Sequence, residues 1–503
     1  MIGPGPVGPG PVPDSAGPRC SPPRTLSEPC AYLPRIADAH LTIPRLFEAA
    51  VADVPEKPWL FFEDESYTYE GARERIAAAA AGLAERGVAK GDLVLATASN
   101  EPRYVFLWLA AAYLGAIHVA VDPRQTATEL DGLVGQVEPK LVVTDDELPE
   151  LFGEPGALAG PGPAGPDDAA VLIPTSGTTG RSKLVTQTQR AYAMAGEGFP
   201  WWLGLTAEDR LMTSLPLFHV NAPAYSVLGS VAARASLVLL PRFSASGFLD
   251  SARRYGATEF NAIGAMIEIL MRQPERPDDA DNPLRLAYTG PAPPRERHLE
   301  IERRFGLELR SGYAMSETTY GTFWRHGTRP YGTLGSPRQH PTLGEVNEAR
   351  VNADGELELR NPAVMKGYWG MPEETARVLG PDGWLKTGDL VTDNGDGTYT
   401  FVGRTKEVIR RRGENVAPAE IEEALVSHPD VVEAAVVGVP SELSEEEIKA
   451  FVVVREGAEP DFDALRDWAA DRLTRFKVPE HFEALEELPH TATGRVAKHR
   501  LPT

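Results

Sequence analysis

The sequence predicts an α/β protein whose large N-terminal domain holds doubly wound sheets with helices, followed by a small α+β C-terminal domain on a hinge. Two observations predict this organisation. From about residue 40 onward, helical patterns alternate with short β-rich runs, and near residue 403 the pattern changes. Such alternation is typical of βαβ units with parallel sheet. The chain has 503 residues, 42% of them hydrophobic, which is enough for more than one core.

In the large domain, the pattern of residues 70–87 predicts a helix. Short apolar runs after it predict strands at 92–99, 116–122 and 140–145. A Gly- and Pro-rich stretch at 153–168 then precedes an apolar run that meets a loop of glycines and hydroxyl side chains. We expect this loop to be the first chemical landmark of the domain.

The small domain is predicted from short strands with charged turns in residues 403–416. A helix that starts at Pro418 follows, and the strands 431–439 and 448–454 come after it. We therefore expect a disordered leader over residues 1–35, an N-terminal domain over 36–403 and a mobile C-terminal domain over 404–503.

Composition excludes several classes of function. The 50 Lys and Arg against 72 Asp and Glu give a net charge of -22, which disfavours nucleic acid and anionic membrane as partners. No apolar run approaches the roughly 18 residues of a membrane span, and no signal peptide is evident, so we expect a cytoplasmic protein. Cys20 and Cys30 both lie in the leader, which leaves neither a disulfide framework nor a Cys-based metal site.

The segment TSGTTGRSK (175–183) has the side chains expected of a polyphosphate-binding loop. Glycines allow a close backbone approach, hydroxyls donate hydrogen bonds and a lysine supplies positive charge. These residues are Thr175, Ser176, Gly177, Thr178, Thr179, Gly180 and Lys183. The spacing is not that of a Walker A loop. A flexible surface loop is the alternative.

Two further segments supply candidate nucleotide ligands. In GYAMSETT (312–319), the ring of Tyr313 can stack on a purine, with Ser316 beside the carboxylate of Glu317, which can hold Mg²⁺ bridged to phosphates. In GWLKTGDL (383–390), Asp389 can accept hydrogen bonds from ribose hydroxyls. Taken alone, the first segment is more often a packed tyrosine near a solvated acid, and the second is more often an ordinary turn.

Together, these segments resemble the adenylate-forming superfamily, which comprises acyl-CoA ligases, peptide-synthetase adenylation domains and beetle luciferases. The resemblance rests on motifs in the family's order: TSGTTGRSK, TGPAPP (289–294), GYAMSETT, GWLKTGDL, GRTKEVIRRRGENVAPAEIE (403–422) and TATGRVAK (491–498). The RRGENV segment is similar to the carnitine- and crotonobetaine-CoA ligase branch. The resemblance implies that a carboxylic acid and MgATP give an acyl-adenylate, from which a thiol then displaces AMP.

The resemblance also assigns residues to roles. Residues 175–183 bind phosphates, Tyr313 stacks on adenine, Glu317 binds Mg²⁺, and Asp389 with Arg404 holds the ribose. The purine-side turn is Gly290, Pro291 and Ala292. His219 lies at the acyl carboxylate, although a lone His among apolar residues is more often a core histidine. Gly264 and Ala265, with Ala314, belong to an acyl pocket for which we expect a bulky, apolar acid.

The thiol-transfer elements match the family. Lys406 occupies the hinge position, and Gly413 falls in the loop that forms the pantetheine tunnel. Arg410, Arg411 and Arg412 precede Gly413 and favour coenzyme A as the acceptor, with a solvated turn as the alternative.

Departures from the family cluster on the ATP-dependent step. Pro291 removes an N–H from the purine-side turn, and Ala314 and Ser316 replace commoner residues. Arg495 occupies the position of the lysine that bridges the substrate carboxylate and the α-phosphate. We therefore expect impaired adenylation, with acyl-adenylate taken preformed, from a partner adenylating ligase. Rescue by Lys498 would need a helical turn in the tail.

Two rival functions stay open at this point. One is a stand-alone adenylating enzyme that loads a carrier protein. The other is a non-catalytic protein that binds acyl-nucleotides without turnover.

Overall fold

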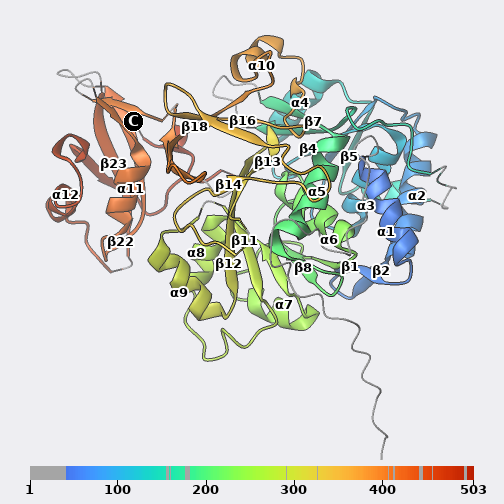
Figure 1. Cartoon of the computed structure of the whole chain (residues 1–503), viewed down its shortest axis with the longest axis horizontal. Helices are drawn as coiled ribbons and strands as arrows, with labels where there is room; N and C mark the ends of the chain where they lie inside the picture. Colours follow the sequence, from blue (N-terminus) through green and yellow to red (C-terminus); the bar gives the residue numbers. More distant parts are fainter. Residues whose placement is uncertain are drawn as a thin grey trace, which may run out of the picture.

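A computed structural model describes the chain over residues 41–153, 158, 160–175, 182–290, 292–325, 327–405, 407–411, 414–440, 446–455, 457–491 and 496–502. It confirms the predicted fold class, a large α/β N-terminal part followed by a small C-terminal one (Figure 1). The expected leader lies outside the described residues. So do these predicted site residues: Ser176, Gly177, Thr178, Thr179, Gly180, Pro291, Lys406, Arg412, Gly413 and Arg495, together with the Arg410 side chain.

The largest of the three sheets in the N-terminal part has nine strands in the order β14-β13-β12-β11-β10-β8-β9-β1-β2. Its central strands run parallel, and antiparallel pairs occur at the β1/β2 and β12/β13/β14 ends. The strands are β1 (Pro58–Phe62), β2 (Glu65–Thr68), β8 (Arg210–Thr213), β9 (Ser236–Leu239), β10 (Glu259–Asn261), β11 (Leu286–Thr289), β12 (Glu308–Met315), β13 (Thr318–Phe323) and β14 (Ser336–Pro337).

The second sheet has six strands in the order β17-β7-β6-β4-β3-β5. They are β3 (Leu93–Thr97), β4 (Ile117–Val121), β5 (Leu141–Thr144), β6 (Ala169–Thr175), β7 (Lys183–Thr188) and β17 (Gly367–Tyr368). A third, antiparallel sheet follows in the order β15-β16-β18-β19. Its strands are β15 (Glu348–Val351), β16 (Glu356–Arg360), β18 (Leu385–Asp393) and β19 (Tyr399–Arg404).

Local sequence explains where several helices begin and end. The Thr68 side chain accepts a 3.0 Å bond from the Gly71 amide at the start of α2. Gly115 ends α3 with φ 70°, a left-handed conformation that favours glycine. Helices of the N-terminal part are α1 (Ile43–Asp53), α2 (Tyr69–Glu85), α3 (Pro102–Leu114), α4 (Ala127–Val137), η2 (Leu148–Leu151), α5 (Gln189–Leu203), η3 (Ala222–Val227), α6 (Leu228–Ala233), α7 (Phe248–Tyr255), α8 (Gly264–Arg272), α9 (Arg295–Phe305) and α10 (Pro372–Val378).

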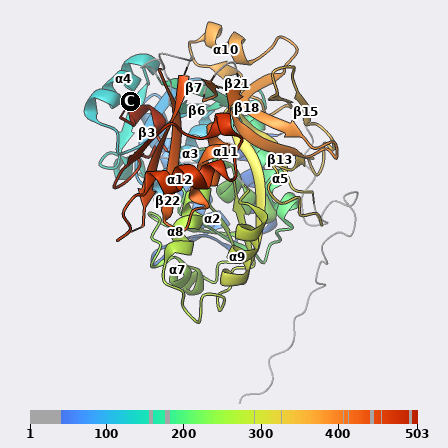
Figure 2. The same ribbon diagram turned by 90° about the vertical axis from the view of Figure 1, so that its left-hand side faces the viewer.

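The C-terminal part has its own apolar core, which includes Ile409, Ile421 and Leu425. Figures 1 and 2 show it in orange and red beside the third sheet, and α11 contacts β19 there. Its elements are β20 (Ile409–Arg411), β21 (Glu414–Val416), α11 (Pro418–Val426), β22 (Val431–Pro440), β23 (Glu446–Val454), α12 (Phe462–Ala470), η4 (Arg475–Lys477), β24 (His481–Ala484) and η5 (Lys498–Arg500). A separate core is what a domain that moves as a unit requires.

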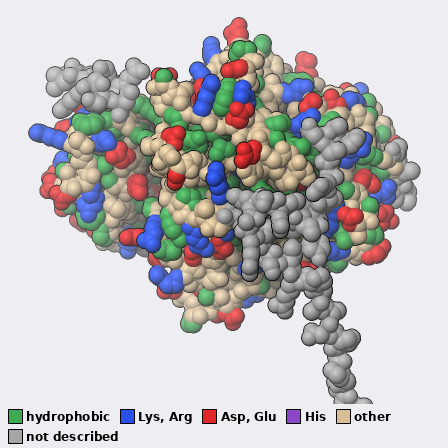
Figure 3. All heavy atoms as spheres, in the orientation of Figure 1, with side chains coloured by type: hydrophobic (Ala, Val, Ile, Leu, Met, Phe, Trp, Pro, Cys, Tyr) green, Lys and Arg blue, Asp and Glu red, His purple; other side chains and the backbone are tan. Residues whose placement is uncertain are grey.

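Two surface properties bear on the partners expected from composition. On the face drawn in Figure 3, basic and acidic side chains are interspersed. Within the described ranges, no helix has the length and apolar character needed to cross a membrane.

Candidate active site

The predicted site residues come from strands of all three sheets. Thr175 ends β6 and Lys183 starts β7, so the candidate phosphate loop is the connection between two paired strands. Tyr313 and Ala314 lie near the end of β12, while Asp389 lies on β18. Among these strands, β12 pairs in parallel with β11, and the carboxyl ends of parallel strands are where α/β proteins place their ligands.

Lys183 and Glu317 lie on either side of Tyr368. The Lys183 ammonium pairs with Glu374 at 2.6 Å and lies 4.8 Å from the centre of the Tyr368 ring. On the other side, the Tyr368 hydroxyl donates a 2.8 Å hydrogen bond to Oε1 of Glu317. Burial and the nearby Glu317 carboxylate raise the pKa of Tyr368, so the phenol keeps the proton that it donates. The structure thus joins the candidate phosphate lysine to the candidate metal carboxylate through one tyrosine.

The backbone that carries Glu317 is held at two further points. The buried amide of Gln187 donates to the carbonyl of Ser316 at 2.6 Å. The Glu317 carbonyl accepts a 2.8 Å bond from the Met365 amide. These contacts hold the β12–β13 turn, which carries Glu317, against β7 and against Met365.

Tyr313, Asp389 and Arg404 form a second cluster. The Tyr313 hydroxyl donates to Oδ2 of Asp389 at 2.5 Å, and the Arg404 guanidinium pairs with Oδ1 at 2.9 Å. Burial and the Asp389 carboxylate raise the pKa of Tyr313 well above its ordinary value. Asp389 itself is 1% exposed. The structure therefore brings all three residues together, with both carboxylate oxygens engaged by protein groups.

The candidate purine-side turn follows β11. Gly290 and Ala292 are half-buried. A side chain at position 290 is excluded because its Cβ would lie 2.7 Å from the carbonyl oxygen of Gly312. Ala314 and Ser316 are half-buried on the neighbouring segment. The turn and the segment that carries Tyr313 are therefore packed backbone to backbone.

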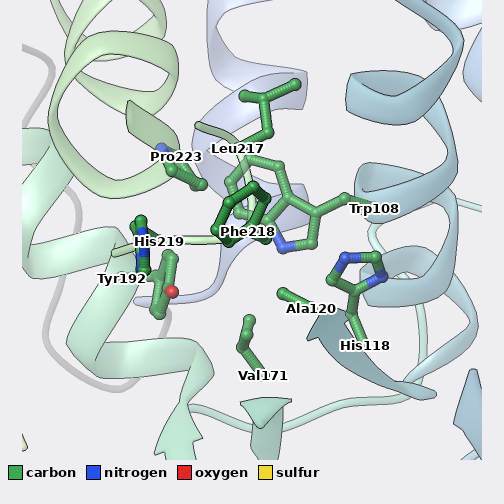
Figure 4. A pocket seen from close by; sticks show the side chains of 9 residues that line it. All are labelled: Trp108, His118, Ala120, Val171, Tyr192, Leu217, Phe218, His219 and Pro223. Carbon is green, nitrogen blue, oxygen red and sulfur yellow. The ribbon is translucent and has the colours of Figure 1, made fainter. Parts of the chain in front are cut away.

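His219 lies in the turn just before η3, a short π-helix, an element that occurs often at functional sites. His219 also lines a small cavity behind the turn, which Figure 4 shows with Trp108, His118, Tyr192 and Phe218 around it. Gly264 and Ala265 lie on α8 and do not line this cavity.

Arg411 corrects one prediction. Its side chain is 3% exposed, donates to the carbonyls of Phe476 at 3.0 Å and Val478 at 2.8 Å, and pairs with Glu447. A guanidinium held in this way is a structural group of the small domain. The structure therefore contradicts the prediction that the Arg411 guanidinium belongs to a cationic patch for coenzyme A.

Lys498 is engaged as well. It starts the short helix η5, so the chain does turn there, but its ammonium pairs with Glu422 at 2.7 Å and Glu407 at 3.1 Å. Both partners belong to the small domain. Its ammonium thus ties the tail to the residue that follows the predicted hinge position.

Sequence reasoning missed three residues of the site: Gln187, Tyr368 and Glu374. Tyr368 and Glu374 occur in the stretch KGYWGMPEET (366–375), which combines glycines, aromatic rings and acids. A Gly-Tyr pair just before a Pro-led acidic helix was the available signal.

A large-domain arginine contacts the small domain. Arg272, at the end of α8, donates to the carbonyl of Val432 at 3.0 Å and lies 3.7 Å from Glu433. The helix that begins with Gly264 and Ala265 therefore ends at the domain interface.

Known proteins match this chain over nearly its whole length. The AMP-binding enzyme profile matches residues 47–369, and the profile of the C-terminal domain of AMP-binding enzymes matches residues 420–495. The crotonobetaine/carnitine–CoA ligase of Salmonella enteritidis PT4 is 30% identical over 89% of this chain and 96% of its own length. The sulfoacetate–CoA ligase of Cupriavidus necator is 31% identical over 92% and 97%.

Solved structures agree. The ATP-bound MatB of Rhodopseudomonas palustris superposes with a TM-score of 0.83 at 28% identity, over 90% of this chain and 97% of that one. The o-succinylbenzoate CoA synthetase of Bacillus subtilis, in complex with its acyl-adenylate intermediate, gives 0.81 at 26% identity, over 91% and 97%. Because both profiles match, and because CoA ligases are about 30% identical over most of the chain, the chain belongs to the AMP-binding enzyme family. This family is the adenylate-forming superfamily that the sequence resembles.

Proposed function

We propose that this protein is an acid–thiol ligase that converts a carboxylic acid into its coenzyme A thioester. In the first step a carboxylate oxygen attacks the α-phosphate of ATP and pyrophosphate leaves. In the second step the thiol sulfur attacks the acyl carbonyl and AMP leaves. The observation that carries the proposal is the arrangement in which Tyr368 links Lys183 to Glu317. Tyr313, four residues before Glu317, is hydrogen-bonded to Asp389.

Lys183 serves the polyphosphate in this proposal. Its side chain is largely buried, and its ammonium pairs with Glu374 at 2.6 Å. An incoming phosphate competes for the same ammonium, so binding exchanges one ion pair for another. Glu374 thus positions the lysine in the absence of nucleotide.

Glu317 fits a magnesium ion that is shared with phosphates. Mg²⁺ in nucleotide sites is usually held by one or two carboxylates together with phosphate oxygens and water. Glu317 is a half-buried carboxylate with one oxygen hydrogen-bonded to Tyr368, which fixes its direction. Bound there, the ion would neutralise charge on the leaving pyrophosphate.

Coenzyme A is favoured over a carrier protein as the acceptor. The relatives described above are named as CoA ligases, and their matches extend over 89–92% of this chain. Arg411 gives no support, because its guanidinium is buried in the small domain. The assignment therefore rests on the relatives and on the RRGENV segment.

The finer proposal is that adenylation is the slower half-reaction. Arg495 stands where the resemblance places a lysine, and a guanidinium is broader and stiffer than an ammonium between two oxygens. Loss of one well-placed electrostatic stabiliser costs about 10²- to 10³-fold in rate, and less if the charge is retained. Thiol transfer does not need that residue, since the carboxylate and α-phosphate are already joined.

The test compares the two half-reactions. Pyrophosphate exchange measures adenylation, and transfer from a supplied acyl-adenylate to coenzyme A measures the second step. We expect weak exchange in the wild type, a rise in Arg495→Lys and equal transfer in both. Brisk wild-type exchange would rule out the finer proposal and leave the ligase assignment intact.

A further inference from the structure

A buried asparagine lies at the carboxyl edge of the nine-stranded sheet. Asn261, the last residue of β10, is 1% exposed. Its amide nitrogen donates to the Asn221 side-chain oxygen at 3.0 Å and to the Ser226 hydroxyl at 2.9 Å. Its own oxygen accepts a hydrogen bond from no group among the described residues. A buried acceptor without a donor costs about 1–3 kcal/mol, so a ligand that supplies one gains that free energy.

Asn221 connects this acceptor to the candidate site. It is half-buried, two residues after His219 and directly before η3. Ile263 and Gly264, which follow Asn261, are also half-buried. The asparagine pair therefore lies between the His219 turn and the start of α8, the two segments assigned to the acyl group by resemblance.

The space beneath the pair is filled by an arginine and two tyrosines. Arg338, 2% exposed, donates to the hydroxyls of Tyr225 at 2.9 Å and Tyr288 at 2.5 Å. Tyr225 lies on the same η3 helix that Asn221 precedes, and Tyr288 pairs in register with Asn261. A Cβ at Gly312 would lie 2.9 Å from the guanidinium and 3.0 Å from the Tyr288 hydroxyl, so no side chain fits at that position. An acyl group that reaches the pair cannot extend deeper between η3 and the sheet.

We propose that the acid activated here is short and carries a hydroxyl group, which Asn261 and Asn221 recognise. This inference rests on the proposed function and names its substrate class. A hydroxyl donates and accepts at once. It can donate to the oxygen of Asn261 and accept from the amide nitrogen of Asn221, whose own oxygen already accepts from Asn261.

Charged groups fit this pair less well. A carboxylate cannot donate to Asn261 at neutral pH, and an ammonium cannot accept from Asn221. The Arg338 guanidinium is bonded to two hydroxyls and also to the carbonyls of Thr319 and Thr322, both at 3.1 Å. We therefore expect the substrate to be a short hydroxy acid and not the bulky, apolar acid predicted from Gly264 and Ala265.

The test uses stable acyl-adenylate mimics, so that it does not depend on turnover. Calorimetry would give the affinity of the full chain for N-acylsulfamoyl adenosines. The hydroxyacyl mimics are lactoyl and 3-hydroxybutanoyl, and their matched partners without the hydroxyl are propanoyl and butanoyl. The benzoyl mimic represents a bulky, apolar acid. We expect at least one hydroxyacyl mimic to bind about tenfold more tightly than its partner. The preference should fall to within about twofold in Asn261→Leu, which keeps the shape and removes the acceptor.

Ser226→Ala is the matched control. It removes the other partner of the Asn261 amide and leaves the Asn261 oxygen in place, so the preference should persist. If Asn261→Leu does not fold, the half-buried Asn221→Ala should reduce the preference as well. Equal binding within both pairs, tightest binding of benzoyl, or a preference that survives both asparagine variants would overturn the inference.

The same samples separate this inference from the proposed function. Acyl-CoA formed from ATP, coenzyme A and the corresponding acids is measured by mass spectrometry. Discrimination among the mimics without thioester from any acid would contradict the proposed function alone. Thioester from both acids of each pair with equal efficiency, together with equal binding of the mimics, would contradict the inference alone.

Discussion

Replacing Tyr368 with Phe tests whether one hydroxyl positions the carboxylate assigned to magnesium. The hydroxyl donates to Glu317 at 2.8 Å from a ring that is 8% exposed. A hydrogen bond to a charged group is worth about 1.5–3 kcal/mol, which corresponds to roughly 10- to 100-fold in rate if the transition state feels all of it. We expect pyrophosphate exchange to fall by about tenfold or more.

Thiol transfer should respond differently. Pyrophosphate has left before the thiol attacks, so transfer from a supplied acyl-adenylate should change by no more than about threefold in Tyr368→Phe. Tyr399→Phe is the control, because that hydroxyl donates to the Ala349 carbonyl at 3.5 Å in the third sheet and not to Glu317. An equal fall in both half-reactions, or unchanged exchange in a folded Tyr368→Phe, would refute the positioning role.

Three other substitutions test the structural account. Arg411→Met removes the donor to the Phe476 and Val478 carbonyls and to the Glu447 carboxylate. We expect the free energy of unfolding, measured by denaturant titration, to fall by about 3–5 kcal/mol, and an unchanged midpoint would contradict the buried role. Arg272→Ala removes an exposed contact to Val432 worth less than about 1 kcal/mol, so it should shift the ratio of the two half-reactions by a few-fold without lowering the melting temperature. His118→Phe tests a pH effect, because burial lowers the pKa of His118 to about 3. Between about pH 6.5 and 3 the unfolded chain therefore binds one more proton than the folded chain, and the free energy of unfolding decreases as the pH falls. The variant should lose about 1.4 kcal/mol per pH unit of that slope, and an identical slope would count against the neutral buried histidine.

The fold was largely predictable from the sequence because its signals are local. The run predicted as a strand over 92–99 contains β3, whose residues are all buried, and the predicted helix over 70–87 contains most of α2. Apolar periodicity and turn residues set these elements independently of the rest of the chain. Element ends differ by one or two residues, where caps decide the boundary.

The contacts within the site were not predictable in the same way. Lys183, Glu317 and Tyr368 are far apart in sequence, and the pairing of β17 with β7 brings Tyr368 next to Lys183. Their chemistry could be assigned by resemblance, but their mutual distances depend on sheet order.

Arg411 was misassigned although a local signal existed. In β20, Ile409 and Arg411 are two residues apart and therefore share a face of the strand. Ile409 is buried at 1% exposure, and Arg411 follows it into the small-domain core. The three consecutive positive charges suggested a ligand site, whereas the strand period of two places Arg411 on the buried face.

The most direct test of the central claim is the product balance of the complete reaction. The full chain is incubated with MgATP, coenzyme A and a panel of short hydroxy acids and other carboxylic acids, and nucleotides and thioesters are quantified together. The account predicts that acyl-CoA and AMP appear in equal amounts, with no ADP, and that both disappear in Lys183→Ala. Formation of ADP, or the absence of acyl-CoA from every acid and from supplied acyl-adenylates by a folded protein, would contradict it.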